Sequence, residues 1–305
     1  MIHYLALLLL VRLGERIPLP LLDAAARVAG TLAWRLSRRL RAVTRDHMRH
    51  VLGPQAAAGE VDRAAREAVR TAARGYAEFA HLPAFTPEAV RARVVSFQGL
   101  DALTGAAAEG RGAILVSAHL GAPEMLSRAA PAFGIDFAAI EEPLEPPRVR
   151  ALVHGRRAVA GVHYVPATLA GLREARQHLA RGGVLGVLVD RDVLHTGRRA
   201  TFFGERALMP PGAVELAHRT GAPLVAVWCT REATGRYRLR AERLDLPPAT
   251  GDREADVAAG MRVVIAALEE AIRATPGQWF PLTSIWNGLA ADRMRASSDR
   301  AARLQ

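Results

Sequence analysis

The chain has 305 residues, of which 50% are hydrophobic and 23% charged, so it can bury a large core in one large domain or two small ones. This composition excludes a disordered chain. All 41 basic residues are arginine against 30 acidic residues, and the net charge of +11 gives a positive field that attracts nucleic acid, anionic lipid headgroups or phosphorylated ligands.

The single cysteine, Cys229, stands in the apolar segment PLVAVWCT. One cysteine excludes a disulfide framework and a cysteine-based zinc site. We therefore expect Cys229 to be a buried structural thiol.

The first 50 residues combine a short apolar run with an arginine-rich helix. The run from Tyr4 to Val11 is shorter than the roughly 20 residues that a membrane span needs, and it lacks the flanks of a signal peptide. Two interpretations of the helix remain open: it packs on its own domain with a solvated basic face, or it docks on an anionic membrane. Its apolar positions are Leu22, Val28, Leu32, Leu36 and Leu40, and its arginines are Arg27, Arg35, Arg38, Arg39, Arg41 and Arg45.

Helical spacing continues over residues 54–92, at Val61, Ala65, Val69, Ala72 and Tyr76. From Val94 onward, short apolar segments alternate with helical ones. This alternation predicts an α/β fold with a central mixed, mainly parallel sheet flanked by helices. Residues 1–90 are predicted as a helical membrane-docking region packed on a catalytic domain of residues 91–305. Strands are expected within 111–120, 133–140, 161–167, 182–190, 220–229 and 235–244, and helices within 168–182 and 210–221.

The segment ILVSAHLGAPEML, residues 114–126, carries His119 and Glu124 just after an apolar run. Residues 113–116 are predicted as a buried strand, and Pro123 suits the first turn of a helix. His119 then lies at the carboxyl end of a strand, where α/β sheets gather active groups. Glu124 could fold back and hold one ring nitrogen while the other takes a proton. A general base is one interpretation, and a histidine satisfied in a turn is the other.

Four further blocks follow in an order that is more specific than any one of them. They are Asp190-Arg191-Asp192, Phe202-Phe203-Gly204, Pro211-Gly212 and Ala222-Pro223. Together with the H-x4-E pair they make residues 25–290 resemble the bacterial lipid A biosynthesis (lauroyl/myristoyl) acyltransferase family. DRD followed by FFGE looks most like the actinobacterial branch, the phosphatidylinositol mannoside acyltransferases.

The resemblance implies roles for particular residues. His119 and Glu124 correspond to the catalytic pair. An acidic residue and an arginine of the pocket correspond to Glu142 and Arg157, with their neighbours Glu141 and Arg156 as alternatives. Substrate contacts are also implied for Asp190, Arg191, Asp192, Phe202, Phe203, Gly204 and Glu205, although core packing is the alternative for the two phenylalanines.

The implied reaction moves an acyl group from acyl-CoA or acyl carrier protein to a hydroxyl of a membrane glycolipid, a phosphatidylinositol mannoside or a lipid A-like molecule. His119 would take the acceptor proton, Glu124 would orient the imidazole, and backbone amides near Gly121 or the Arg157 side chain would stabilise the oxyanion. Neither a cofactor nor a metal is implied. The expected partners are anionic lipid, the donor and the acceptor, at the cytoplasmic face of the inner membrane, with a peripheral or monotopic enzyme.

Three other functions stay open. A serine hydrolase fits the α/β pattern, but the chain has no G-x-S-x-G motif, and Ser117 merely precedes His119 by two residues. A nucleic-acid-binding protein would use the arginine excess, yet no recognised module is present and only 5% of residues are aromatic. A catalytically silent lipid-binding homologue would not need an intact His119 and Glu124.

Overall fold

The computed structural model describes residue 8 and residues 11–142, 144, 146–158 and 162–286. Most of the apolar run from Tyr4 to Val11 lies outside the described residues. The same holds for residues 287–305 at the end of the predicted catalytic domain.

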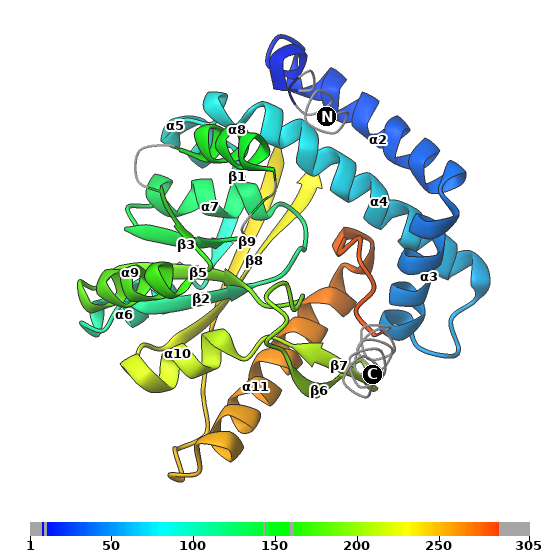
Figure 1. The fold of residues 1–305 in the computed structure, drawn as a ribbon. Coiled ribbons are helices and arrows are strands. Elements are labelled where there is room, and N and C mark those ends of the chain that lie inside the picture. The colour runs from blue at the N-terminus through cyan, green and yellow to red at the C-terminus, as the bar shows by residue number, and fades with distance from the viewer. Residues whose placement is uncertain (1–7, 9–10, 143, 145, 159–161, 287–305) are drawn as a thin grey trace, which may run out of the picture.

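A seven-stranded sheet forms the centre of the described chain (Figure 1). Its order is β1-β9-β8-β2-β5-β3-β4, and every neighbouring pair is parallel except the antiparallel β8 and β9. The predicted mixed, mainly parallel sheet is thus confirmed, with β2 in its middle. The strands are β1 (Val94–Gln98), β2 (Ala113–Ser117), β3 (Phe137–Glu141), β4 (Val162–Pro166), β5 (Val184–Leu188), β8 (Leu224–Ala233) and β9 (Arg236–Leu244), and a separate hairpin consists of β6 (Arg198–Phe202) and β7 (Glu205–Met209).

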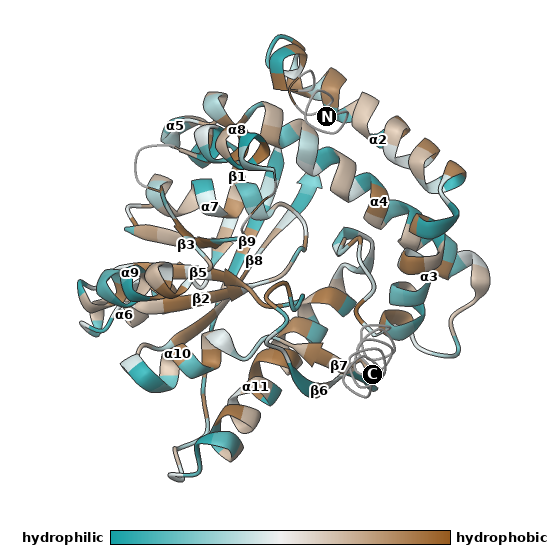
Figure 2. Cartoon of the chain, in the orientation of Figure 1, coloured by the Kyte–Doolittle hydropathy of each residue, from teal (hydrophilic) through white to brown (hydrophobic). Residues whose placement is uncertain are grey.

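Helices cover both faces of the sheet, and the strand residues divide between two cores (Figures 1 and 2). Successive side chains of a strand point to opposite faces, so in β2 Ile114 and Val116 enter one core while Ala113 and Leu115 enter the other. The helices around the sheet are α5 (Pro87–Arg93), α6 (Leu100–Ala108), α7 (Pro123–Ala132), α8 (Pro147–Arg157), α9 (Leu169–Ala180), α10 (Gly212–Thr220) and α11 (Arg253–Ala274), with 3-10 turns η1 (Leu82–Ala84) and η2 (Pro276–Gln278).

The N-terminal helices are α2 (Leu19–Leu36), α3 (Arg38–Leu52) and α4 (Ala58–Ala80). One continuous arginine-rich helix over residues 22–45 is therefore wrong. The backbone of Ser37 is extended, and its hydroxyl accepts a hydrogen bond from the Leu40 amide, which caps the start of α3. Helix α2 packs along α4, and at Gly30 a Cβ would lie only 2.8 Å from the Cα of Arg70, so the two backbones come close there.

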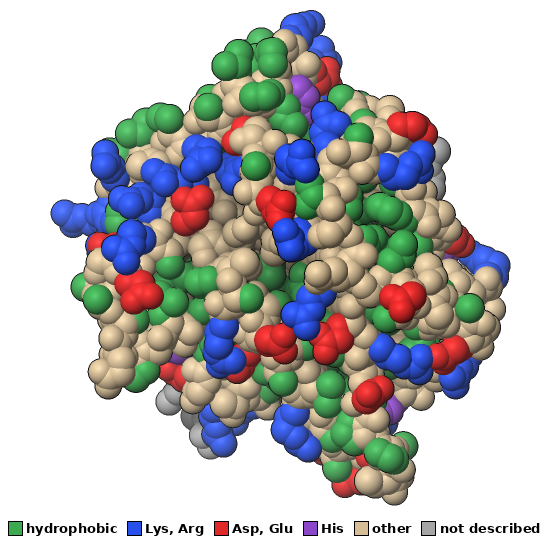
Figure 3. All heavy atoms as spheres, turned by 180° about the vertical axis from the view of Figure 1, so that it is seen from behind, with side chains coloured by type: hydrophobic (Ala, Val, Ile, Leu, Met, Phe, Trp, Pro, Cys, Tyr) green, Lys and Arg blue, Asp and Glu red, His purple; other side chains and the backbone are tan. Residues whose placement is uncertain are grey.

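The apolar stripe of these helices divides between core and solvent. Leu22 is buried against α4, and Leu40 packs on the main core. On α2 the exposed fractions of four other apolar residues range from 49 to 80%: Leu21, Val28, Leu32 and Leu36. Hydrophobic side chains also gather beside arginines at the upper end of the molecule in Figure 3. No helix among the described residues is long and apolar enough to cross a membrane. The predicted boundary near residue 90, between a membrane-docking region and a catalytic domain, stays a prediction.

Candidate active site

His119 and Asp190 meet at the carboxyl ends of two neighbouring strands. Strands β2 and β5 are parallel and pair Ser117 with Leu188, so the residues two positions further on emerge side by side. The Asp190 carboxylate accepts a hydrogen bond from the His119 ring Nδ1 at 2.8 Å and another from the His119 amide at 3.0 Å. The Trp279 indole N–H donates a third hydrogen bond at 3.0 Å. The imidazole is therefore fixed in position and orientation.

The electrostatics of this pair favour an ionised Asp190. Its side chain is fully buried, and burial alone would raise its pKa, but the charge and hydrogen bonds of His119, with help from Trp279, hold the pKa below its ordinary value. A carboxylate can only accept, so Nδ1 of the imidazole carries a proton. In the neutral ring, Nε2 is then the basic nitrogen.

Glu124 does not hold the imidazole in the structure, which corrects the interpretation drawn from the H-x4-E spacing. It lies in the first turn of α7, and its carboxylate accepts hydrogen bonds from the Arg157 guanidinium, including 3.1 and 3.2 Å contacts from Nε. Asp190 takes the place beside Nδ1 because it leaves the adjacent strand at the level of His119. A carboxylate still orients the histidine, but it comes from 71 residues downstream.

Arg157 lies at the centre of a charged cluster. Besides Glu124, its Nη1 donates to Glu141 at the end of β3, at 3.0 Å. Burial by itself would lower the pKa of Arg157, but the two carboxylates outweigh it and raise that pKa. Beside the cluster, burial and the charge of Glu124 raise the pKa of Tyr164 to about 12. The guanidinium therefore stays charged and the phenol neutral.

A pocket of about 500 Å³ connects these groups. Its wall includes His119, Glu124 and Arg157, and it extends over the sheet at Leu115, Ala139 and Gly186 and beneath α7, α8 and α4. Tyr76, predicted on the apolar stripe of α4, is 55% exposed and lines the pocket instead. Further apolar lining residues are Leu126, Phe137, Ile140, Leu144, Val149, Val153, Phe280 and Leu282.

The predicted acidic residue and arginine of the pocket and their two neighbours have different positions. Arg157 lines the pocket, whereas Arg156 turns away and donates to the backbone carbonyls of Val11 and Ala80. Glu142 also lines the pocket, where it accepts a 3.0 Å hydrogen bond from Arg191. Glu141 is the carboxylate that binds Arg157. The predicted Glu142, Arg157 and Arg191 therefore share one cavity.

The residues predicted from the FFGE motif do not line this pocket. Phe202 is fully buried, and its ring packs on Phe203, Trp279 and Trp286. Phe203 and Gly204 form the tight β6–β7 turn, with φ of +49° and +80°. The Glu205 carboxylate binds His50 Nε2 at 2.9 Å. These four residues close the hairpin, so core packing, the alternative for the phenylalanines, is what the structure supports.

The two aspartates of the DRD motif have supporting positions as well. Asp190 is enclosed behind His119, out of reach of a substrate in the pocket. Asp192 accepts a 3.0 Å hydrogen bond from the Thr196 amide and shapes the loop before β6. Of this motif only Arg191 lines the pocket.

Three backbone amides at and beside Gly121 donate hydrogen bonds within the protein. The His119 amide donates to Asp190, the Gly121 amide to the Gln278 carbonyl at 2.9 Å, and the Ala122 amide to the Cys229 carbonyl at 2.8 Å. At Gly121 a Cβ would lie 2.0 Å from the Cys229 oxygen, and φ is +63°, so this close approach requires glycine. Of the two predicted oxyanion donors, Arg157 is the one that faces the pocket.

Two buried residues have structural contacts. The Ser117 hydroxyl, 3% exposed as a residue, donates to the Val227 carbonyl at 2.7 Å, so it is not presented as a nucleophile. Cys229 is buried, and burial raises the pKa of its thiol. Both observations disfavour a covalent acyl-enzyme through these side chains.

Sequence patterns missed several residues that complete the site. Trp279 and Phe280 come from the segment after α11, and Tyr164 comes from β4. Only a folded topology brings these segments to His119. A buried strand ending in Asp190 was the one local signal for the partner of the histidine.

The chain matches a known enzyme family over most of its length. The family model of the bacterial lipid A biosynthesis acyltransferases matches residues 1–287. The chain belongs to this acyltransferase family. Phosphatidylinositol mannoside acyltransferases from Mycobacterium tuberculosis and Mycolicibacterium smegmatis are similar to it, each with 29% identity over 65% of this chain. The matches span 62% and 64% of these relatives. The predicted resemblance to the lipid A acyltransferase family, and to the phosphatidylinositol mannoside acyltransferases within it, is confirmed.

Proposed function

We propose that this member of the acyltransferase family moves a fatty acyl group from a thioester to a hydroxyl of a membrane glycolipid. The observation that carries the proposal is an imidazole fixed by a buried aspartate at the mouth of a largely apolar pocket. Such a histidine is suited to remove a proton from a hydroxyl. The pocket offers an acyl chain an apolar wall.

The reaction needs one base and no nucleophile on the protein. Nε2 of His119 takes the proton of the acceptor hydroxyl while the hydroxyl oxygen forms a bond to the thioester carbonyl carbon. The carbonyl electrons move to oxygen and then return as the carbon–sulfur bond breaks. The imidazolium gives its proton to the departing thiolate, so the products are an ester and a free thiol. Asp190 stabilises the imidazolium between the two proton transfers.

Arg157 is the proposed donor to the developing oxyanion. Glu124 and Glu141 hold its guanidinium in the pocket wall, and such preorganised donors lower the barrier because they need no reorganisation during the reaction. In this proposal Glu124 acts through Arg157 and not through the imidazole. Both H-x4-E residues then contribute to catalysis by different routes.

The chemistry of the pocket and the names of the relatives support the proposed substrates. The donor is an acyl thioester, either acyl-CoA or acyl carrier protein, and no cofactor takes part. The relatives are named for phosphatidylinositol mannoside, and we propose a related mannosylated or lipid A-like glycolipid as acceptor. Arg191 beside Glu142 at the pocket offers a cation for a phosphate group.

The acceptor is a membrane lipid, so we propose that α2 docks on an anionic membrane surface. Four exposed apolar residues lie along this helix, and exposed Arg27, Arg35, Arg38 and Arg39 stand near them. Such a face binds by apolar burial and by attraction to anionic headgroups. The enzyme would then be peripheral or monotopic at the cytoplasmic face of the inner membrane.

The first experiment is acyl transfer from radiolabelled palmitoyl-CoA, and separately from acyl carrier protein, into a membrane lipid extract. A labelled glycolipid should form with the wild-type chain and with His163→Ala, an exposed histidine paired with Glu174. It should disappear with His119→Ala and Glu124→Ala. Release of free fatty acid alone by the wild type, or full transfer by His119→Ala, would contradict the proposal.

Membrane docking is tested by sedimentation with vesicles that contain phosphatidylglycerol. The double variant Leu32→Glu/Leu36→Glu should remain in the supernatant. The matched control is Leu169→Glu on α9, because Leu169 is as exposed as Leu36, at 81 against 80%. Equal sedimentation of both variants would argue against α2 as the docking face.

A further inference from the structure

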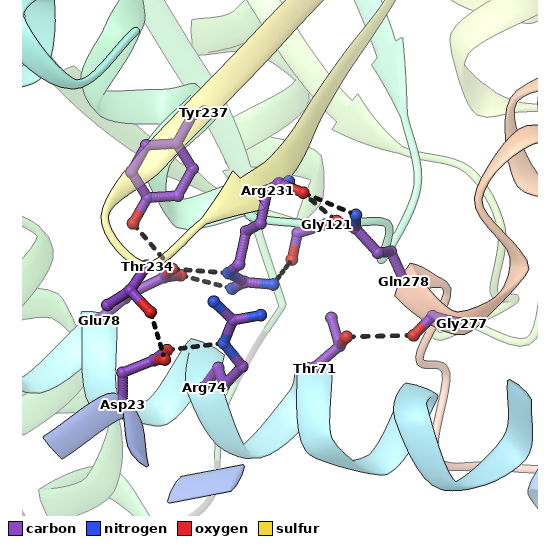
Figure 4. A network of polar contacts seen from close by, with 10 residues as sticks. All are labelled: Asp23, Thr71, Arg74, Glu78, Gly121, Arg231, Thr234, Tyr237, Gly277 and Gln278. Atoms are coloured by element: carbon purple, nitrogen blue, oxygen red, sulfur yellow. Dashed lines mark hydrogen bonds and ion pairs between the residues drawn. The ribbon is translucent and has the colours of Figure 1, made fainter. Parts of the chain in front are cut away.

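Arg231, a buried residue of β8, binds the backbone of Gly121 (Figure 4), in the same turn as His119. Its Nε donates to a Glu78 carboxylate oxygen at 2.6 Å, and its Nη2 donates to the other. Its Nη1 donates to the Gly121 carbonyl, two residues after His119. All three guanidinium nitrogens are therefore engaged, although Arg231 and Glu78 lie in the pocket wall.

Gln278 binds both Arg231 and the turn of Gly121. Its side-chain amide donates to the Arg231 carbonyl and accepts from the Arg231 amide, both at 2.9 Å. Its backbone carbonyl accepts from the Gly121 amide. Both backbone groups of Gly121 are thus fixed, one by the Arg231 side chain and one by a residue that Arg231 aligns.

The Glu78 carboxylate is itself held in place on α4. The Tyr237 hydroxyl donates a hydrogen bond to it at 2.8 Å, and the Glu78 side chain is only 5% exposed. Burial alone would lower the pKa of Arg231, but the charge of Glu78 outweighs it, so the guanidinium remains charged. A charged donor in a site shielded from water makes a strong hydrogen bond to a carbonyl.

We propose that Arg231, fixed by Glu78, is a positioning residue for the acyl transfer proposed above, on which this inference rests. It sets the place of Gly121, and thereby keeps His119 aligned with Asp190 and Nε2 directed at the acceptor. Arg231 touches no substrate in this scheme. Helix α4 thus takes part in catalysis through one carboxylate.

The same network contains a matched control pair. Arg74 Nε donates to Asp23 at 2.6 Å, and Thr234 donates to the other Asp23 oxygen at 3.0 Å (Figure 4). The Asp23 and Arg74 side chains are 7 and 9% exposed, so this pair is nearly as buried as Arg231 and Glu78. Among the described hydrogen bonds, none of this pair reaches the turn of His119.

The experiment compares Arg231→Met, the double variant Arg231→Met/Glu78→Met and the control Arg74→Met. Thermal melting reports folding, and the kcat and donor KM report function. The double variant removes both buried charges, which restores stability in many proteins. We expect kcat to fall about 10²-fold in both Arg231 variants, with donor KM nearly unchanged, because a displacement near 1 Å has that effect. Arg74→Met should keep the wild-type kcat.

A readout without substrate separates this inference from the proposed function. In chains with ¹⁵N-labelled histidine, the Nδ1 proton signal of His119, assigned by its loss in His119→Ala, should shift in both Arg231 variants and stay in Arg74→Met. An unshifted signal, or a stable double variant with wild-type kcat, would overturn the positioning role. If the wild-type chain transfers no acyl group, the proposed function fails, and the signal still decides whether Arg231 aligns His119.

Discussion

The pocket at the carboxyl ends of β2 and β5 and the aromatic cluster at the β6–β7 hairpin both contain motif residues, but they use them differently. In the pocket, His119, Glu124 and Arg157 face a cavity. At the hairpin, Phe202 packs between rings, 5.9 Å from Trp279 and 5.7 Å from Trp286 by centroids. The charged side chains of the pocket are open to a ligand, whereas the rings of the hairpin cluster pack on each other and leave no room for one.

Trp279 belongs to both regions and connects them. Its ring contacts Phe202 and Phe203, while its indole N–H binds Asp190. The hairpin therefore supports the orientation of the imidazole from a distance. The comparison predicts that variants of the pocket lower the rate, whereas variants of the hairpin lower the stability.

The largest expected effect belongs to Asp190→Asn. An amide cannot stabilise the imidazolium and disturbs the ring tautomer, so kcat should fall by about 10⁴-fold while the chain stays folded. Steady-state transfer rates and circular dichroism together check this. A folded variant with normal kcat would assign Asp190 to the packing residues and remove the contrast between the regions.

Phe202→Ala tests the hairpin. Truncation of a fully buried ring leaves a cavity, and the free energy of unfolding should fall by about 3–5 kcal/mol. Urea denaturation measures the change. In buffer without urea, where the variant is folded, its preference among acyl chains should match that of the wild type. A variant of normal stability with an altered chain preference would show that the ring contacts substrate.

The pH dependence of stability distinguishes the regions further. His47 lies in the aromatic cluster, 5.3 Å from Trp279 by ring centroids, and burial, together with the charge of His50, lowers its pKa to about 4. Above pH 6.5 the ring is neutral in both states, so it has no effect there. As pH falls from 6.5 to 4 only the unfolded chain takes up the proton, and stability should decrease by up to about 3 kcal/mol.

Denaturation at pH 7 and pH 4.5 measures this loss. His47→Gln should reduce it, because the substitution removes the titrating group. His163→Gln, an exposed histidine, is the control and should leave it unchanged. An equal pH dependence in both variants would locate the acid sensitivity elsewhere.

The smallest effect is expected for Gly204→Ala in the hairpin turn. Its φ of +80° is strained for a residue with a side chain. Apart from the adjoining residues of the chain, no heavy atom lies within 4 Å of the place that a Cβ would take, so only the backbone preference is lost. The unfolding free energy should fall by about 1–2 kcal/mol with normal kcat. A lowered kcat without loss of stability would connect this turn to the reaction.

Local patterns predicted most of the sheet because its central strands, such as β2 and β5, are apolar runs, and β9 alternates polar and apolar residues. They missed β1, whose residues are half-buried, and the β6–β7 hairpin, whose strand β6 begins with two arginines. They placed one helix across Ser37, since the spacing of leucines continues through a residue that caps α3. The periodicity of apolar residues predicted whether a segment is a helix or a strand, whereas the ends of these elements depend on single side chains such as that of Ser37.

The site was predictable in its parts but not in its pairings. His119 and Arg157 were found, but the partner of the imidazole depends on which strands are neighbours, and that is a property of the whole sheet. Glu124 lies close to His119 in sequence, but it binds Arg157 instead, because the end of α8 brings Arg157 to the pocket. Glu78 and Arg231 carried no local signal, since their pairing joins residues 153 positions apart.

The register of β2 and β5 has a consequence for changing this enzyme. The pairing of Ser117 with Leu188 decides which side chains stand opposite each other at the strand ends. One residue inserted into either strand would displace His119 from Asp190 by about 3.3 Å and turn it to the other face. New acyl or glycolipid specificity should therefore be sought among the pocket-lining residues of α7 and α8 other than Glu124 and Arg157, because these side chains can change while the ladder beneath them keeps His119 beside Asp190.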